Sequence, residues 1–241
     1  MTQPIDSGGT TKSRAPIGAQ QLARAGIRPR ALLLDLDGTL ADSLGVMKTV
    51  YRRFMQGEGR APTDAEFDRL NGPPLAEGVR ILKYIHGLAA PLAELLARYQ
   101  TLIEEVYGTV PPSAGAHALL EVAKARGLTV GVVTSNGEAR TRAWLAQAGL
   151  DGLVDVVVGS EAVARGKPAP GPYLVALKQL DRAPEAARAV EDSPLGAAAA
   201  RAAGIPTFAL LHDPKKTSGW PAGVTFVTSL ADVQKRIEAE T

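Results

Sequence analysis

Polar side chains that suit phosphoryl-group chemistry follow several apolar stretches of this 241-residue sequence. The set contains three aspartates, a glutamate, hydroxyls, an amide and one lysine, and it contains no histidine. Its members are Asp35, Asp37, Gly38 and Thr39, then Thr134, Ser135 and Asn136, then Lys167, and finally Glu191, Asp192 and Ser193. Open α/β sheets bind ligands at the carboxyl ends of their strands. These residues therefore form one candidate site.

Two of the aspartates are suited to a magnesium ion. Mg²⁺ takes hard oxygen ligands in an octahedron and keeps several waters. The carboxylates of Asp35 and Asp192, provided by neighbouring strands together with a backbone carbonyl, would form a natural site for it. The sequence thus predicts Mg²⁺ as a cofactor.

The same set can catalyse phosphoryl transfer. A carboxylate can attack a phosphoryl group to give an aspartyl phosphate, if a metal and a cation neutralise the negative charges. Lys167 is the available cation. Asp37 projects to the same side of the strand as Asp35, two residues earlier, and could protonate the leaving alcohol and later deprotonate the attacking water.

Backbone and hydroxyl groups complete the predicted phosphate site. Gly38 permits a tight turn after the first apolar run. Thr134, with the backbone N–H groups around Ser135 and Asn136, can hold the oxygens of the phosphoryl group that is transferred.

The elements that must position these residues alternate along the chain. Apolar runs of strand length lie at 31–36, 128–134, 154–158, 187–190 and 206–211, and helix-length segments lie at 117–126, 138–148, 172–180 and 195–203. Such alternation predicts an α/β fold with a doubly wound parallel sheet.

One interval is too long for this alternation. Gly38 and Leu128 are 90 positions apart, whereas a strand–helix–strand unit takes about 30 residues. The surplus has helical patterns at 43–56, 76–86 and 91–107. We expect residues 44–110 to form an inserted helical domain, 29–43 and 111–241 to form the core domain, and 1–28 to be a flexible leader.

Four segments of the sequence resemble, in order, the motifs of the haloacid dehalogenase superfamily of phosphotransferases. They are DLDGTLADS, VTSN, GKPAP and VEDSPLGAAAARAAGI, and the resemblance extends from Ala31 to about Leu211. The inserted helical segment is similar to the cap of the subfamily that contains phosphoglycolate phosphatase and β-phosphoglucomutase. In that subfamily the cap closes over the site and selects the substrate.

The resemblance implies a role for each site residue. Asp35 is the expected nucleophile, Asp37 the general acid and base, Thr134 the phosphate-binding hydroxyl and Lys167 the phosphate-binding cation, all four being catalytic. The implied metal site consists of Asp35, Asp37, Asp192 and Glu191, with Glu191 acting through a water or from just outside the direct ligands. The implied phosphate site consists of Gly38, Thr39, Thr134, Ser135, Asn136 and Lys167.

The expected function is that of a Mg²⁺-dependent phosphatase of small phosphorylated metabolites, with phosphoglycolate or a sugar phosphate as substrate. Dehalogenation is disfavoured because such relatives need no metal and lack an aspartate equivalent to Asp37. Phosphonoacetaldehyde hydrolysis is disfavoured because the relatives that catalyse it have a lysine in the cap and no acidic residue at the position of Asp37. A phosphomutase remains the enzymatic alternative, although residues 71–75, NGPPL, lack the arginine of the mutase cap loop.

A phospho-accepting receiver domain is the non-enzymatic alternative, since it also combines a strand-end aspartate, acidic metal ligands, a hydroxyl and a lysine. Its phosphoacceptor lies on a middle strand, and it has no cap. The DLDGT motif here follows the first core strand and precedes a long helical insertion. This arrangement favours the enzyme.

Composition excludes several other kinds of function. The absence of cysteine excludes disulfides, thiolate zinc sites and a cysteine nucleophile, and only three histidines are present. A net charge of +2 gives no support for nucleic-acid binding, and no apolar run approaches the roughly 20 residues that span a bilayer. We expect a cytoplasmic monomer or homodimer that binds a small phosphorylated metabolite and neither nucleic acid nor membrane.

A few residues outside the motifs could have either a structural or a functional role. Arg52 and Arg53 lie on the first helix of the insertion, where they could meet an anionic substrate, and residues 71–75 resemble a cap loop that reaches the active site. Structural or surface roles are expected for the remaining candidates, which are His86, His117, His212 and Trp144.

Overall fold

The computed structural model describes residues 29–70 and 74–240 of the chain. Six strands form one parallel sheet in the order β3-β2-β1-β4-β5-β6. The strands are β1 (Ala31–Leu34), β2 (Thr129–Val133), β3 (Val156–Val158), β4 (Ala187–Glu191), β5 (Thr207–Leu210) and β6 (Thr225–Val227). The predicted doubly wound α/β architecture is confirmed, while the predicted leader at 1–28 lies outside the described residues.

The register of the central strands brings their carboxyl ends to one level. Leu34, the last residue of β1, pairs with Val132 of β2 on one side and with Val190 of β4 on the other. The next residue, Asp35, still donates its backbone N–H to the Val190 carbonyl at 3.0 Å. The polar residues that follow β1, β2 and β4 therefore meet at one edge of the sheet.

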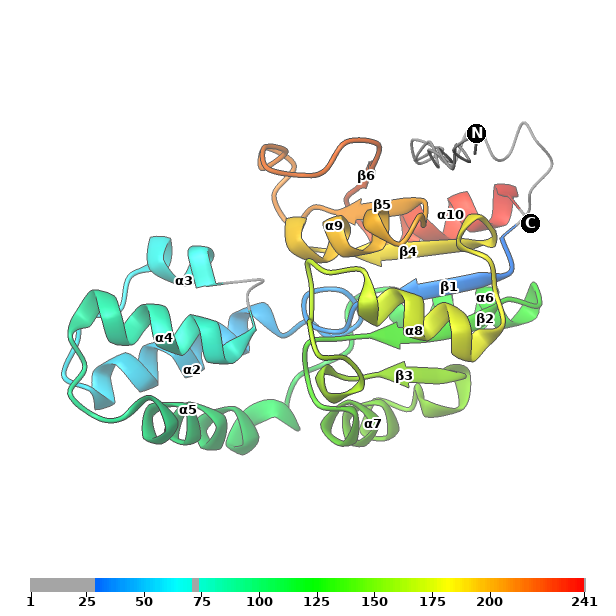
Figure 1. Ribbon diagram of the computed structural model, residues 1–241. Helices are drawn as coiled ribbons and strands as arrows, with labels where there is room; N and C mark the ends of the chain where they lie inside the picture. The colour runs from blue at the N-terminus through cyan, green and yellow to red at the C-terminus, as the bar shows by residue number, and fades with distance from the viewer. Residues whose placement is uncertain (1–28, 71–73, 241) are drawn as a thin grey trace, which may run out of the picture.

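Helices cover both faces of the sheet (Figure 1). The side chain of Leu33 packs on one face, against α8 (Gly171–Leu180) and α9 (Pro194–Ala202). Its neighbours Leu32 and Leu34 pack on the opposite face, in a core that includes α6 (Ala116–Ala125) and α10 (Leu230–Glu240). This alternation is the period of two that a strand imposes on its side chains, and it buries β1 completely.

Four helices are inserted between β1 and α6, beside the carboxyl edge of the sheet (Figure 1). They are α2 (Leu44–Gly57), α3 (Asp64–Leu70), α4 (Leu75–His86) and α5 (Leu92–Tyr107). In α2, Val50, Tyr51 and Phe54 are buried at the three- and four-residue spacing of a helix face. The ring of Phe54 lies 4.8 Å from that of Tyr99 in α5. The helical insertion is thus observed. The limits of the inserted domain, residues 44 and 110, remain a prediction.

Three elements were not expected from the sequence. Among the seven residues of α3 only Glu66 is buried, so this helix has no continuous apolar stripe. Strand β6 has three residues, of which only Val227 is buried. In α10, Leu230, Val233 and Ile237 do form a helical stripe. The remaining elements are α7 (Glu138–Gln147) and the short 3₁₀ helices η1 (Asp151–Leu153), η2 (Ser160–Ala162) and η3 (Pro184–Ala186).

Among the helices of the described chain, none has both the length and the apolar character that crossing a membrane requires.

Candidate active site

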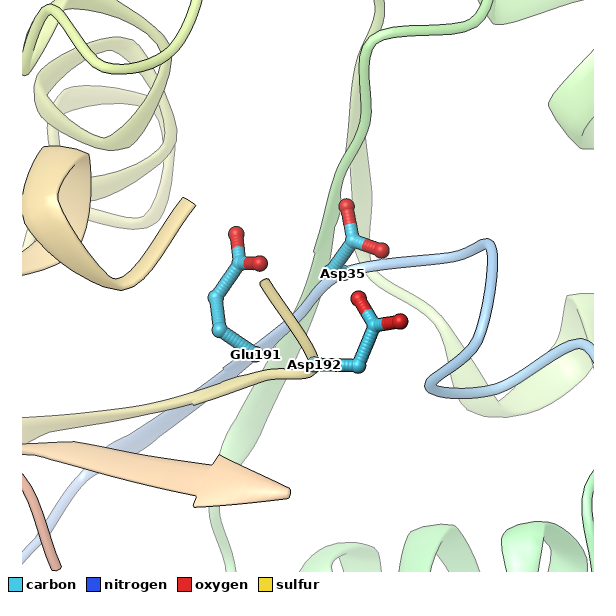
Figure 2. A group of neighbouring side chains, drawn as sticks. All are labelled: Asp35, Glu191 and Asp192. Atoms are coloured by element: carbon cyan, nitrogen blue, oxygen red, sulfur yellow. The ribbon is translucent and has the colours of Figure 1, made fainter. Parts of the chain in front are cut away.

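Three carboxyl groups converge at the carboxyl edge of the sheet. Asp35 follows β1, Glu191 ends β4 and Asp192 comes directly after it. Figure 2 shows the side chains of Asp35 and Glu191 extending from adjacent strands toward the same region, with the carboxyl group of Asp192 close to Asp35. One oxygen from each of the three residues lies within 4.8 Å of the others. The predicted meeting of these strand ends is therefore observed.

Lys167 places a buried cation between two of these carboxylates. Its Nζ lies 2.5 Å from Asp35 Oδ1 and 2.6 Å from Glu191 Oε1, and it donates a hydrogen bond to the Val133 carbonyl at 2.9 Å. Burial alone would lower the pKa of Lys167, but the charges of Asp35 and Glu191 outweigh it and raise the pKa above its usual range. Lys167 is thus held as an ammonium ion.

Glu191 is enclosed more completely than the two aspartates. Its side chain is fully buried, and the Tyr173 hydroxyl donates to Oε1 at 2.5 Å. Gly196, in the first turn of α9, lies against the same carboxylate, so that a Cβ at this position would be 2.0 Å from Glu191 Oε2. With Lys167 and Tyr173 on one oxygen and α9 packed against the carboxylate, Glu191 is well placed to fix the position of Lys167.

The charges at this edge fit a divalent cation. Within the group, three carboxylates face one ammonium ion, so two negative charges remain when all are ionised. Burial, and next to it the charges of Glu191 and Asp192, raise the pKa of Asp35, although Lys167 opposes the shift. Carboxylate oxygens are the donors that Mg²⁺ prefers. A bound divalent cation would remove the repulsion and keep Asp35 ionised.

Asp37 is held by a pair of hydrogen-bond donors from distant parts of the chain. Asn136 Nδ2 donates to its Oδ2 at 2.5 Å, and the hydroxyl of Tyr107, the last residue of α5, donates to its Oδ1 at 3.1 Å. The same Asn136 amide contacts the Tyr107 hydroxyl at 3.0 Å. Burial raises the pKa of the Asp37 carboxyl, which is the direction that suits a residue acting as a proton donor near neutral pH.

The turn after β1 depends on a glycine. Gly38 has φ of +79°, in the left-handed region where residues with a Cβ are strained. A Cβ at this position would lie only 2.0 Å from Asp192 Oδ2. The glycine therefore allows both the turn and the close approach of Asp192, in agreement with the predicted tight turn.

A cavity of about 180 Å³ lies over this edge and reaches the inserted helices. Predicted site residues line its core side: Asp35, Asp37, Thr134, Ser135, Asn136, Lys167 and Asp192. Thr134 is 3% exposed, and its hydroxyl accepts a hydrogen bond from the Asn136 backbone N–H at 3.0 Å. The cavity thus has a polar floor formed by residues from four separate segments.

Several predicted residues lie away from the cavity. Thr39 is fully buried, with no hydrogen-bond partner for its hydroxyl among the described residues, and neither Thr39 nor Gly38 lines the cavity. Arg52 and Arg53 are exposed, pair with Asp64 and Glu105, and are not among the described residues that line the cavity, so their contact with substrate stays a prediction. Of the loop at 71–75, residues 71–73 lie outside the described chain, and Leu75 does line the cavity.

Other residues near the site were missed. Tyr107 and Tyr173 each reach a site carboxylate from a helix, and nothing in their local sequence announces it. His212 was expected to be structural or on the surface, but its Nε2 lies 3.6 Å from Asp192 Oδ2. The nearby carboxylate of Asp192 raises the pKa of His212. Since His212 follows a predicted strand at 206–211, the strand-end rule could have identified it. Trp144 is buried in its helix, as expected.

Comparisons with known proteins agree with this geometry. Residues 32–210 match the family model of haloacid dehalogenase-like hydrolases. The chain is 34% identical over 197 residues to a phosphoglycolate phosphatase of Rhodospirillum rubrum, a match that covers 76% of this chain and 80% of the relative. It is 26% identical over 204 residues to a bifunctional riboflavin kinase/FMN phosphatase of Arabidopsis thaliana, covering 84% of this chain but only 54% of that protein.

Among solved structures, a β-phosphoglucomutase-like protein of Thermotoga maritima has a TM-score of 0.73 and 26% sequence identity, covering 88% of this chain and all of that one. The family match spans the segments that provide Asp35, Asp37, Thr134, Lys167 and Asp192. The fold, the order of the motifs and these relatives together establish that the chain belongs to the haloacid dehalogenase-like hydrolase family.

Proposed function

We propose that this chain is a Mg²⁺-dependent phosphatase that hydrolyses small phosphorylated metabolites through an aspartyl phosphate on Asp35. One observation carries the proposal: Lys167 lies 2.5 Å from the Asp35 carboxylate at the floor of the cavity, with Asp192 beside it. A buried carboxylate that is oriented by a cation and exposed to a cavity on one side is arranged for nucleophilic attack.

In the first proposed step, Asp35 attacks the phosphorus atom and the bond to the ester oxygen breaks. Asp37 gives its proton to that oxygen, so the alcohol leaves neutral. Lys167 remains beside Asp35 and offsets the negative charge of the phosphoryl group. Thr134, Ser135 and Asn136 line the same cavity. The backbone N–H groups of Thr134 and Asn136 donate within the protein, so the two hydroxyls and the Ser135 backbone N–H are the groups proposed to hold the phosphoryl oxygens.

In the second proposed step, Asp37 now acts as a base. It removes a proton from water, which attacks the phosphorus atom of the aspartyl phosphate. Inorganic phosphate is released, Asp35 regains its carboxylate and Asp37 regains its proton. Tyr107 and Asn136 hold the Asp37 carboxyl throughout, so that the same group serves both steps.

The metal site of this proposal consists of the carboxylates of Asp35 and Asp192, with Asp37 at the same edge and Glu191 acting through a water or through Lys167. When bound there, Mg²⁺ would supply positive charge to the ionised carboxylates and to the substrate phosphate.

The names of the relatives suggest two reference substrates. Phosphoglycolate is the substrate named for the Rhodospirillum rubrum relative, and a sugar phosphate is the substrate of a β-phosphoglucomutase. The likeness to the Thermotoga maritima structure also keeps a phosphomutase as the second candidate. A mutase returns the phosphoryl group to a sugar hydroxyl, whereas a phosphatase transfers it to water. Release of inorganic phosphate from glucose 1-phosphate, measured against formation of glucose 6-phosphate, distinguishes the two activities.

The direct test is hydrolysis of p-nitrophenyl phosphate by the full chain, with Mg²⁺ and after its removal by a chelator. We expect Asp35→Asn to abolish turnover and to retain the circular dichroism spectrum, because the amide is nearly isosteric but cannot attack. Asp42→Asn is the matched control, since Asp42 is an exposed carboxylate in the same segment. Retention of a tenth of the rate in Asp35→Asn would assign the nucleophile elsewhere.

A further inference from the structure

The wall of the cavity opposite the predicted catalytic residues is apolar. Aliphatic and aromatic side chains from α2, α3, α4 and α5 line it, among them Met47, Phe67, Leu70, Val79, Leu82 and Ile103. We call these side chains the apolar wall. Once the phosphoryl group of a substrate lies beside Asp35, the remaining part of the substrate must face the apolar wall.

Most cationic side chains of the insertion have partners away from the cavity. None of those described between residues 44 and 110 lines the cavity, and residues 71–73, which lie outside the described chain, are Asn, Gly and Pro and carry no charge. Carboxylates or backbone carbonyls engage seven of the eight lysines and arginines there: Lys48 and Arg52 with Asp64, Arg53 with Glu105, Arg69 with the Ala65 carbonyl, Arg80 with Glu77, Arg98 with Glu58, and Lys83 with the Leu88 carbonyl. Lys167 is the sole cation among the described lining residues.

Hydroxyl groups on the apolar wall are also few. Tyr99 and Tyr107 provide them, and the Tyr107 hydroxyl already binds Asp37 and Asn136. A sugar with several hydroxyls would lose hydrogen bonds to water without replacing them, and a buried carboxylate without a cation would be penalised further. Apolar surface, by contrast, gains stability when it leaves water.

We propose that the substrate is a phosphate monoester of an alcohol whose remaining part is aliphatic or aromatic and carries no second anionic group. This inference rests on the proposed phosphatase function and narrows its substrate class. Phosphoglycolate and bisphosphates both need a second cation, and the described lining residues provide none beyond Lys167, which is paired with Asp35.

The test compares two alkyl phosphates of similar shape on the unchanged full chain with Mg²⁺. One is 4-methylpentyl phosphate, and the other is the phosphate ester of 4-hydroxybutanoate, in which a carboxylate replaces the terminal branched group. The difference is remote from the ester oxygen, so the two leaving groups are chemically similar. We expect kcat/KM for the methylpentyl ester to be higher by at least about tenfold.

Substitutions of Met47 test whether the preference for the methylpentyl ester arises at the apolar wall. It is half-buried on α2, and a lysine or a glutamine there keeps a good helix former of similar length. Met47→Lys is expected to improve kcat/KM for the carboxylate ester relative to the methylpentyl ester by about tenfold or more. Met47→Gln is the matched control, which changes polarity without adding a charge and is expected to leave the carboxylate ester disfavoured.

The outcomes separate this inference from the proposed function. If the chain hydrolyses neither p-nitrophenyl phosphate nor the two alkyl esters, the proposed phosphatase function is itself contradicted. Hydrolysis of both esters with equal efficiency, or a preference for the carboxylate ester, would leave the phosphatase intact and overturn the apolar substrate class. An equal effect of Met47→Lys and Met47→Gln on the ratio would also overturn it, since charge at this wall would then not decide selection.

Discussion

The hydroxyl of Tyr107 donates a hydrogen bond to Oδ1 of Asp37 at 3.1 Å, although the two residues are 70 positions apart. Tyr107 ends the last inserted helix, and Asp37 lies in the turn after the first strand of the core. This bond joins the helical insertion to the proposed general acid and base. The insertion therefore contributes a hydrogen-bond donor to the candidate site as well as lining its cavity.

The first prediction concerns this bond. Tyr107→Phe removes a donor that stabilises the ionised carboxyl, so the pKa of Asp37, already raised by burial, rises further. Asp37 must be protonated when the alcohol leaves, so the alkaline limb of the pH–rate profile for kcat/KM is expected to move to higher pH. We expect kcat to fall about tenfold because a hydrogen bond to a charged group is lost. An unchanged profile in steady-state assays would show that Tyr107 does not position Asp37.

The second prediction separates the two roles of Asp37. Asp37→Asn is expected to slow hydrolysis at least about a hundredfold, because the residue can no longer donate or accept the proton. In single turnovers, p-nitrophenyl phosphate should lose less in the phosphorylation step than an alkyl phosphate, since its leaving group needs little protonation. Equal losses for both substrates would contradict the acid role.

The third prediction concerns the metal and stability. Three clustered carboxylates with a single ammonium ion repel one another, so Mg²⁺ is expected to raise the melting temperature of the unchanged chain. Asp192→Asn removes one charge, which should make the metal-free protein more stable and reduce the shift that Mg²⁺ produces. Calorimetry with and without a chelator measures both effects. An undiminished Mg²⁺ shift in this variant would place the metal elsewhere.

The fourth prediction concerns the turn after β1. Gly38→Ala forces a Cβ into the left-handed region and to within 2.0 Å of Asp192 Oδ2. The strain of a left-handed residue costs about 1–3 kcal/mol, and Asp192 must move away. We expect a lower melting temperature and a weaker apparent affinity for Mg²⁺ in the activity assay. An affinity equal to that of the unchanged chain would show that the metal does not depend on this contact.

The sequence predicted those parts of the site that are local in the chain. Asp35, Thr134 and Asp192 each follow an apolar run, and parallel strands with a common register bring such positions to one edge. Tyr107 and Tyr173 could not be predicted in this way. Each is a buried aromatic residue of a helix, and the carboxylate that it contacts lies on another element.

The fold was predicted where hydrophobic patterns were strong. Strand β1 is buried on both faces and appears in the sequence as the continuous apolar run ALLL. Strand β4 is buried over its whole length although it contains Arg188 and Glu191. Strand β6 at 225–227 buries one residue of three, so it has no such run. Helix α10 has buried apolar residues at 230, 233 and 237, a helical spacing that is visible in the sequence.

The central claim is that Asp35 becomes phosphorylated during turnover. The most direct measurement is rapid acid quenching of the full chain during hydrolysis of p-nitrophenyl phosphate with Mg²⁺, followed by mass mapping of the peptides. We expect a phosphoryl group on Asp35 that accumulates in Asp37→Asn, where its hydrolysis is slowed, and that is absent in Asp35→Asn. Turnover with no phosphoryl group on Asp35 in either active form, or with the group on another residue, would contradict it.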